Sequence, residues 1–487
     1  MKFYSKYLSF LFLILLGSAC KKLTEGHNTN PNTPSDAPYT LQLNGTEVAS
    51  ILVYEGNVAR VTGIFSGSFT GTDRQYISLQ NYTTSAPDYD DAWDNLYATV
   101  ITQAQTVKAK AQAVNDRLTV GIAQVLEAQG FGFATDLWGD IPFSQVGDPT
   151  TYPTPVFDAQ ANVYAGVQAL LDSALNNLAS GVGNGPGSKD FFGGGDPDVW
   201  TKIANTLKAR FFLHTKDYAN AIKYASVGID DASGNMMAPH GSTYLSDFNI
   251  YYSFLTYDRV GYMAADGAPA TQLLDASNDL YHGNAKTDET ARFNYLYQEG
   301  LNTGGLDPNV LCDFDWGNDP TENGFFGGST AFPLVTYEEN QLTLAESYAK
   351  SNQPASALSA LNAYRDYLNA GGYINSGYKS SGLKYSVYTT TDFNAGGILN
   401  PLSSGQTADQ ALLKEILIER YLTFIGQIEQ FNDIRRTKNY IGIKPNTGNK
   451  FPQRILYSQT EINTNPNTPA LSASDLYTET PVNASAY

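Results

Sequence analysis

WTKIANTLKARFFLH (200–214), TKD (215–217) and YANAIKYASVGI (218–229) follow one another without a break, and this stretch decides the fold. In the two longer parts, apolar residues recur at the three-to-four-residue spacing of a helix that buries one face. The polar triplet between them is long enough only for a tight turn. The stretch therefore predicts two antiparallel helices that pack together, with the small residues Ala221 and Ala225 facing the first helix.

A second stretch repeats this design later in the chain. Apolar residues have helical spacing over 337–349 and again over 354–368, with the turn residues 351–353 between them. Pro354 suits the first turn of a helix, where its missing N–H would have no partner in any case. Small residues at the crossing points make both units similar to tetratricopeptide repeats. We therefore expect a mainly α fold with helix pairs and little β structure.

Helical spacing also extends to five further segments. The predicted helices cover 91–113, 116–133, 158–178, 408–424 and 427–436. Asp91, Asp116 and Asp158 stand at the positions where a helix N-cap is expected.

Four irregular sections separate the predicted helices. They cover 63–90, 181–198, 232–328 and 371–407. Loops of this length are usually functional or disordered, and these are rich in aromatic residues and short of charge, which argues against disorder. We expect them to be ordered and to carry the binding site.

The first twenty residues have the pattern of an export signal. Lys2 and Lys6 precede an apolar run over 7–16, and Gly-Ser-Ala-Cys closes the segment at 17–20. The run is too short to span a bilayer, and a cysteine directly after small residues is the acylation position of bacterial lipoproteins. The alternative is an ordinary secreted protein. We expect a signal peptide over 1–19, a lipid anchor at Cys20 with a tether over 20–38, and one helical domain over 39–487. Its loop-rich insertions cover about 232–328 and 371–407.

Charge and cysteine content exclude several classes of protein. The formal net charge of −18 repels phosphate backbones, so no nucleic-acid partner is expected. Once Cys20 is acylated, Cys312 has no cysteine to pair with, and no internal disulfide can form.

No arrangement typical of catalysis stands out. The four histidines have no i, i+4 pair, and no Gly-x-Ser-x-Gly elbow is present, so we expect no enzyme, no metal site and no cofactor. A glycoside hydrolase needs only two carboxylates at the right separation and stays open as an alternative. Structural calcium is a further possibility, because acidic residues cluster at Asp88, Asp90, Asp91 and Asp94 and, with one amide, at Asp313, Asp315, Asn318 and Asp319.

An ordered set of motifs over most of the chain resembles the SusD/RagB family of outer-membrane lipoproteins. The set comprises NTNPNTP at 28–34, Trp93 with Tyr97, DLWGDIPF at 136–143, Trp200 with ANTLKAR at 204–210, the Glu/Arg-rich helices over 415–436 and FPQRILY at 451–457. This resemblance implies a helical fold with large ligand-binding loops. It also implies a lipid-anchored protein of the outer membrane, facing the cell exterior, that binds glycan without catalysis. The expected partner is a TonB-dependent transporter of the SusC type, which imports the captured ligand. A peptide-binding member of the same fold is the alternative.

Binding of sugars requires flat aromatic rings for the C–H face and polar groups for the hydroxyls. Trp93, Trp138 and Trp200 lie in framework motifs and are expected in the core, which leaves Trp316 as a loop residue that could stack on ligand. The other predicted ligand-binding residues are Arg74, Tyr76, Asn81, Tyr82 and Tyr89 before Trp93, and Tyr257, Tyr262 and Tyr281 later in the chain. The acidic and basic residues over 415–436 are expected to form a salt-bridged framework.

Overall fold

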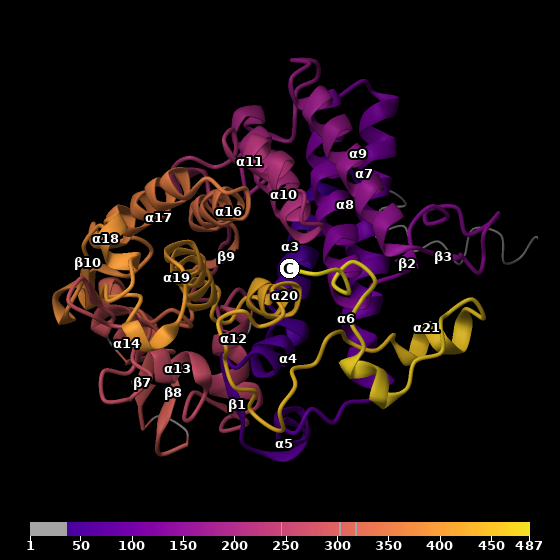
Figure 1. Ribbon diagram of the computed structural model, residues 1–487. Coiled ribbons are helices and arrows are strands. Elements are labelled where there is room, and N and C mark those ends of the chain that lie inside the picture. Colours follow the sequence, from indigo (N-terminus) through magenta and orange to yellow (C-terminus); the bar gives the residue numbers. More distant parts are fainter. Residues whose placement is uncertain (1–36, 245, 301–302, 317–318) are drawn as a thin grey trace, which may run out of the picture.

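Helices make up most of the molecule, and the strands are short (Figure 1). The computed structural model describes residues 37–487 except 245, 301–302 and 317–318. The predicted mainly α fold with little β structure is confirmed. The predicted signal peptide, Cys20 and nearly all of the tether lie outside the described residues. In the part of the chain described, no helix combines the length and the hydropathy that a membrane span requires.

The helices follow the chain in this order. They are α3 (Tyr39–Tyr54), α4 (Asn57–Ser66), α5 (Arg74–Gln80), α6 (Asp90–Asp94), α7 (Thr102–Ala113), α8 (Arg117–Trp138), α9 (Gln160–Leu178), α10 (Pro197–His214), α11 (Tyr218–Ala225), α12 (Ile250–Ser253), α13 (Pro269–Leu274), α14 (Thr290–Leu296), α15 (Asp313–Trp316), α16 (Tyr337–Lys350), α17 (Pro354–Asn369), α18 (Thr390–Phe393), α19 (Ala408–Thr423), α20 (Ile428–Arg436) and α21 (Gln459–Thr464). Two π-helical segments, η2 (Asn95–Ile101) and η5 (Phe254–Asp258), directly continue α6 and α12.

The helix pairs predicted from the sequence are present. Helix α10 packs against α11, and α16 packs against α17; α10 also contacts α9 and α16, so the pairs form a continuous layer. Asp217 caps α11 by accepting the Asn220 N–H, and Pro354 occupies the first turn of α17, as its position predicts.

Several predicted boundaries are wrong. Asp116 is the N-cap of α8, as expected, but Asp91 lies inside α6, and Asp158 accepts the N–H groups of Phe143 and Ser144 instead of capping α9. Helix α8 continues beyond its predicted end at residue 133 and ends at Trp138. The prediction was too short because the second half of the helix is buried on all sides and so shows no amphipathic spacing.

The strands form antiparallel two-stranded ladders. They pair β1 (Thr70–Gly71) with β5 (Met263–Ala264), β2 (Ile141–Pro142) with β3 (Phe157–Asp158), β4 (Met236–Ala238) with β9 (Phe332–Val335), β6 (Thr287–Asp288) with β10 (Lys384–Tyr385), and β7 (Tyr297–Glu299) with β8 (Leu306–Pro308). Several of them join segments that lie far apart in the sequence.

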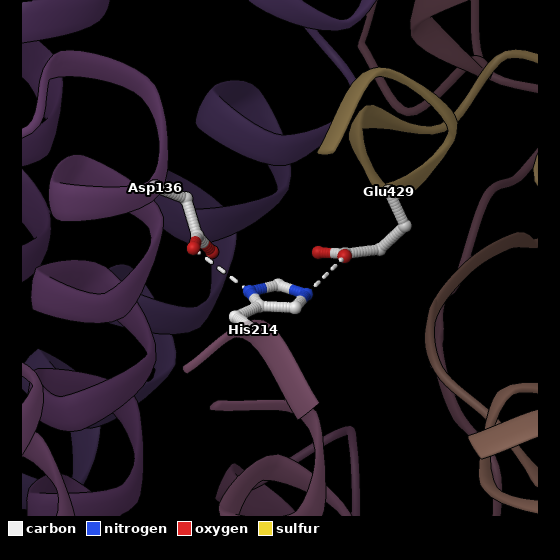
Figure 2. Close-up of side chains that lie close together, drawn as sticks. All are labelled: Asp136, His214 and Glu429. Atoms are coloured by element: carbon white, nitrogen blue, oxygen red, sulfur yellow. Dashed lines mark hydrogen bonds and ion pairs between the residues drawn. The ribbon is translucent and has the colours of Figure 1, made fainter. Parts of the chain in front are cut away.

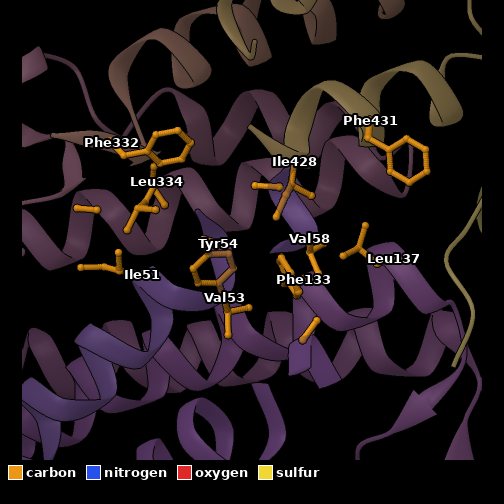
Figure 3. Packing of buried hydrophobic residues seen from close by; sticks show 14 of the residues in the cluster. Ile51, Val53, Tyr54, Val58, Phe133, Leu137, Phe332, Leu334, Ile428 and Phe431 are labelled. Carbon is orange, nitrogen blue, oxygen red and sulfur yellow. The ribbon is translucent and has the colours of Figure 1, made fainter. Parts of the chain in front are cut away.

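The main hydrophobic core lies where α3, α4, α8 and α20 meet (Figure 3). The Tyr54 ring meets the edge of Phe133 at 4.9 Å, and Ile428 of α20 lies over the same layer. Trp93, Trp138 and Trp200 are 3%, 0% and 0% exposed, so their predicted core role is confirmed.

Helices α19 and α20 bring charged side chains into this interior. Glu346 of α16 accepts hydrogen bonds from Arg436, with 2.6 Å between Nη2 and Oε2, and lies 3.3 Å from Arg420 Nε. Asp433 pairs with both arginines, at 2.8 Å from Arg420 Nε and 2.7 Å from Arg436 Nη2. Burial alone would raise the pKa of Glu346, but the charges of Arg436 and Arg420 lower it to about 2.

A second buried group of charges joins α14, α17 and α19. Arg292 contacts Glu289 at 2.6 Å and Glu419 at 3.2 Å, and Arg365 lies 3.3 Å from Glu419. The predicted salt-bridged framework is therefore present, and its partners come from helices distributed along the chain.

His214 connects the third group (Figure 2). Its Nδ1 lies 2.8 Å from Asp136 Oδ1 on α8, and its Nε2 lies 3.2 Å from Glu429 Oε2 on α20. Burial favours the neutral imidazole, but the two carboxylates outweigh it and raise the pKa of His214 to about 9. His214 is therefore a buried imidazolium at neutral pH.

Removal of one charge from the first group should destabilise the protein strongly. In Glu346→Gln, two buried guanidinium groups lose an anionic partner, and we expect the free energy of unfolding to fall by about 3 to 5 kcal/mol. Urea denaturation at pH 7 measures this loss. The control Lys202→Met breaks a surface pair with Asp230 and should cost about 1 kcal/mol or less. Equal losses in the two variants would contradict the role of the framework.

The His214 pair should make stability depend on pH. The folded pKa of about 9 exceeds the unfolded value of about 6.5, so its stabilisation is complete below pH 6.5 and is lost as the pH rises towards 9. Wild type should therefore lose stability across this window more steeply than His214→Gln, by up to about 1.4 kcal/mol per pH unit. Denaturant titrations at four pH values test this, and parallel curves would refute it.

Candidate functional site

Two segments that the sequence analysis assigned to binding meet through the β1–β5 ladder. Thr70 pairs with Ala264 and Gly71 with Met263, and the Thr72 N–H donates to the Tyr262 carbonyl at 2.9 Å. The loop before Trp93 therefore lies beside the segment that follows α12. Figure 1 shows α4, α5, β1 and α12 gathered in one part of the molecule.

The turn between α19 and α20, together with the first part of α20, fixes both segments. Gln430 Oε1 accepts hydrogen bonds from Ser66 Oγ at 2.6 Å and from Ser68 Oγ at 2.5 Å, which holds the end of α4 and the approach to β1. Tyr251 of α12 donates from Oη to the Gly426 carbonyl at 2.7 Å. The charged framework and the candidate site thus share one anchor.

A groove of about 650 Å³ opens between the two segments. Its walls carry guanidinium, amide, hydroxyl and carboxylate groups beside aromatic rings. The lining residues are Asn57, Arg60, Val61, Gln75, Tyr76, Ser78, Leu79, Thr83, Thr84, Ser85, Pro87, Asp88, Asp91, Phe254 and Arg259.

Arg60 is the central cation of this groove. Its Nε donates to Tyr76 Oη at 3.2 Å, and its Cζ lies 4.3 Å from the centre of the Phe254 ring. These contacts hold the guanidinium plane against the aromatic wall, while its Nη1 has no hydrogen-bond partner among the described residues. That Nη1 atom is buried, so any ligand oxygen would have to meet another part of the guanidinium. No signal in the sequence marked Arg60, because it lies within α4 in a segment with no recognisable motif.

Arg74 and Arg259 both lie close to the Tyr262 ring. Their Cζ atoms are 5.8 Å and 5.9 Å from the centre of that ring. Arg74, Asn81 and Arg259 are exposed, so the predicted polar groups Arg74 and Asn81 are available at the surface. Their contact with ligand stays a prediction.

Three of the predicted stacking tyrosines are buried, which corrects the expectation of exposed rings. Tyr76, Tyr82 and Tyr89 are 3%, 4% and 0% exposed. Tyr76 packs against Phe254, Tyr82 accepts the Asn446 N–H, and Tyr89 donates to Thr84. Tyr262, at 8% exposed, is also buried. The position of a tyrosine in a loop cannot distinguish a ring that packs inward from one that faces solvent.

Two exposed rings, Tyr244 and Tyr257, lie next to the groove with the buried Phe248 and the partly buried Phe314, in a cluster that we call the aromatic platform: Tyr244, Phe248, Tyr257 and Phe314. The Phe248 ring stacks on Phe314 at 5.0 Å and 7° and on Tyr257 at 6.1 Å and 15°. Tyr244, 64% exposed, meets Tyr257 edge-on at 5.4 Å. Tyr257 lies on the same π-helical segment as Phe254 of the groove, and such segments are frequent at functional sites.

The predicted Tyr257 lies in this cluster with Tyr244, Phe248 and Phe314, and its contact with ligand stays a prediction. Tyr244 and Phe248 lie outside any helix, so no periodic signal in the sequence marked them. The backbone of Trp316 ends α15, two residues after Phe314. Its side chain lies outside the described residues, so its stacking role stays a prediction.

Tyr281 belongs to another part of the molecule. It lines a second cavity of about 650 Å³ with His282, Lys414 and Lys444, and its Oη accepts the Glu289 N–H at 3.0 Å. The structure does not place it with the other predicted residues.

Two sets of side chains have a separation that could suit a metal ion: Asp136, His214 and Glu429, and His282, Glu415 and Glu419. In both, a histidine already pairs with carboxylates and arginines lie alongside, with Arg210 at 3.6 Å from Glu429 and Arg365 at 3.3 Å from Glu419. The charges of Glu415 and Glu289 outweigh burial and raise the pKa of His282 to about 10. The histidine and arginine charges already balance the carboxylates of both sets, and the expectation of no metal site stays a prediction.

The acidic residues considered for calcium have local partners. Asp88 accepts the Ser85 N–H at 2.7 Å, Asp90 accepts the Thr460 N–H, and Asp313 accepts from Asn323 and Ser329. The side chains of Asp315 and Asn318 lie outside the described residues. Bound calcium stays a possibility that the geometry does not support.

Comparison with known proteins agrees with these observations. Residues 37–239 match the model of a SusD-like family described as "Starch-binding associating with outer membrane". No match was found among curated proteins.

Solved structures share the fold over nearly the whole chain. A SusD/RagB family protein from Bacteroides thetaiotaomicron superposes with a TM-score of 0.69 at 21% identity, covering 93% of this chain and 100% of that one. A chitin-binding SusD homolog from Flavobacterium johnsoniae gives 0.62 at 16% identity, over 88% and 94% of the two chains. A SusD homolog from Bacteroides uniformis gives 0.62 at 17% identity, over 89% and 95%. The chain therefore matches the SusD-like family model over residues 37–239, and the part that the structure describes has the fold of these solved SusD-like proteins.

Proposed function

We propose that the protein binds oligosaccharide chains, without cleaving them, in the groove around Arg60 and on the adjoining aromatic platform. The observation that carries this proposal is the Arg60 guanidinium, held by Tyr76 and Phe254 in a groove lined by amides and hydroxyls. Sugar hydroxyls would accept from the arginines and exchange hydrogen bonds with the other polar groups. The exposed rings of Tyr244 and Tyr257 would contact the apolar face of a sugar.

The match to the SusD-like family model and the structural relatives also support a glycan ligand. The family description names starch and the outer membrane, and one structural relative is chitin-binding. We infer a lipid-anchored protein at the outer membrane that passes the bound glycan to a TonB-dependent transporter of the SusC type. Cys20 would carry the lipid, and the helical layer would leave the groove free for ligand.

Variants of the groove arginines test the binding site. Loss of a hydrogen bond to a charged group costs about 1.5 to 3 kcal/mol, so Arg60→Gln and Arg259→Ala should each weaken binding by about tenfold or more. Isothermal titration calorimetry with maltoheptaose and chitohexaose measures this. Arg117→Ala is the matched control, because Arg117 donates to Asn177 on the helical layer and does not line the groove.

The outcomes of this experiment are distinct. Unchanged affinity in both groove variants, in a wild type that binds one of the glycans, would move the site elsewhere. New reducing ends in the wild-type incubation would show hydrolysis and overturn the non-catalytic proposal.

The aromatic platform should contribute through Tyr244. Because this ring is exposed and its contacts are with other rings, Tyr244→Ala should leave the melting temperature nearly unchanged. Affinity for a bound glycan should fall about threefold to tenfold, as expected for one aromatic contact. Tyr152→Ala, at a tyrosine that is 41% exposed and lies on a different loop, is the control. Equal affinities of the two variants would remove the platform from the site.

A further inference from the structure

Buried glutamates in this protein usually have a positively charged partner, and one of the two exceptions is informative. Among the described residues, all but two of them lie within ion-pair distance of a lysine, arginine or histidine. The first exception, Glu47, lies beside Asp190; burial and that charge raise its pKa to about 10, so Glu47 is a neutral acid. The second is Glu338, which is 4% exposed.

The partners of Glu338 are all uncharged. Tyr367 Oη donates to its Oε1 at 2.6 Å, and Asn235 Nδ2 donates to its Oε2 at 3.3 Å. These bonds orient the carboxylate without neutralising it. The position of Glu338 in the first turn of α16 favours a negative charge there, but a helix terminus compensates a buried charge only in part.

A cavity of about 240 Å³ lies beside this carboxylate. Four aromatic rings line it, those of Tyr295, Phe325, Tyr367 and Tyr373, together with Gln427 of the loop between α19 and α20. Tyr295 lies 5.6 Å from Phe325 at 88° and 6.4 Å from Tyr373 at 43°, so the rings present differently inclined surfaces. Tyr367 and Tyr373 are half-buried and form part of the opening to solvent.

Aromatic rings around a cavity with one carboxylate are the arrangement that recognises a desolvated organic cation. The ring faces attract positive charge, and quaternary ammonium groups use this attraction because they have no N–H to donate. The cavity is below the size of a drug-sized pocket, so its occupant is small. We propose that this cavity binds a small quaternary ammonium compound, whose charge neutralises Glu338.

This site is independent of the proposed glycan groove. The two cavities have no lining residue in common. Failure of one proposal therefore leaves the other standing.

Choline and its uncharged isostere 3,3-dimethyl-1-butanol provide a direct test, because they have the same shape and differ in charge. We expect the purified protein to bind choline in calorimetric titrations, and to bind the isostere at least about tenfold more weakly. Glu338→Gln should weaken choline binding by a similar factor. Tyr373→Phe should preserve it, since it keeps the ring and removes only a hydroxyl.

Glu322→Gln is the matched control, because Glu322 is exposed and does not line the cavity. Thermal melting of each variant verifies that the fold is retained. Should Glu338→Gln not fold, Tyr373→Leu takes its place, with loss of choline binding expected. Absence of choline binding by wild type, equal binding of choline and its isostere, or full affinity in Glu338→Gln would overturn the proposal.

Discussion

The structure depends on the charges that α19 and α20 carry into its interior. A buried carboxylate or guanidinium is costly unless a partner of opposite charge meets it, and here the partners lie on helices far apart in the sequence. Glu346 comes from α16, His214 from α10 and Arg292 from α14. Each pair joins helices that lie far apart in the sequence, and loss of one partner leaves an uncompensated buried charge, so the pairs oppose rearrangement of these helices.

The same two helices position the site. Gln430 of α20 holds α4 and the approach to β1, and the turn between the two helices holds α12 through the Gly426 carbonyl. Arg60 and Phe254, which face each other in the groove, are each a few residues from one of these anchors. A long irregular loop can therefore present polar groups in a fixed geometry, because its ends are tied to the rigid part of the molecule and aromatic packing fills the space beneath it.

Sequence reasoning predicted the helix pairs, the buried tryptophans and the charged framework, because each leaves a periodic or compositional trace. It did not predict that Tyr76, Tyr82 and Tyr89 are buried, because the burial of a loop ring depends on which residues pack over it. Nor could it predict the surroundings of Arg60. The β1–β5 ladder brings its two neighbouring segments together, and with two residues in each strand this ladder is too short to leave a sequence pattern. Nor could it single out Glu338, because the lack of a positively charged partner can be recognised only when the surrounding residues are known.

The central claim is that a rigid frame of buried charges holds a groove that accepts glycan without rearrangement. Hydrogen–deuterium exchange of the protein, alone and with a saturating bound oligosaccharide, measures both parts of it together. We expect amides of α19 and α20 to exchange slowly in both states, and ligand to slow exchange around Arg60, in 74–91 and in 250–262. Rapid exchange in α19 and α20, or ligand protection confined to α9 and α17, would contradict it.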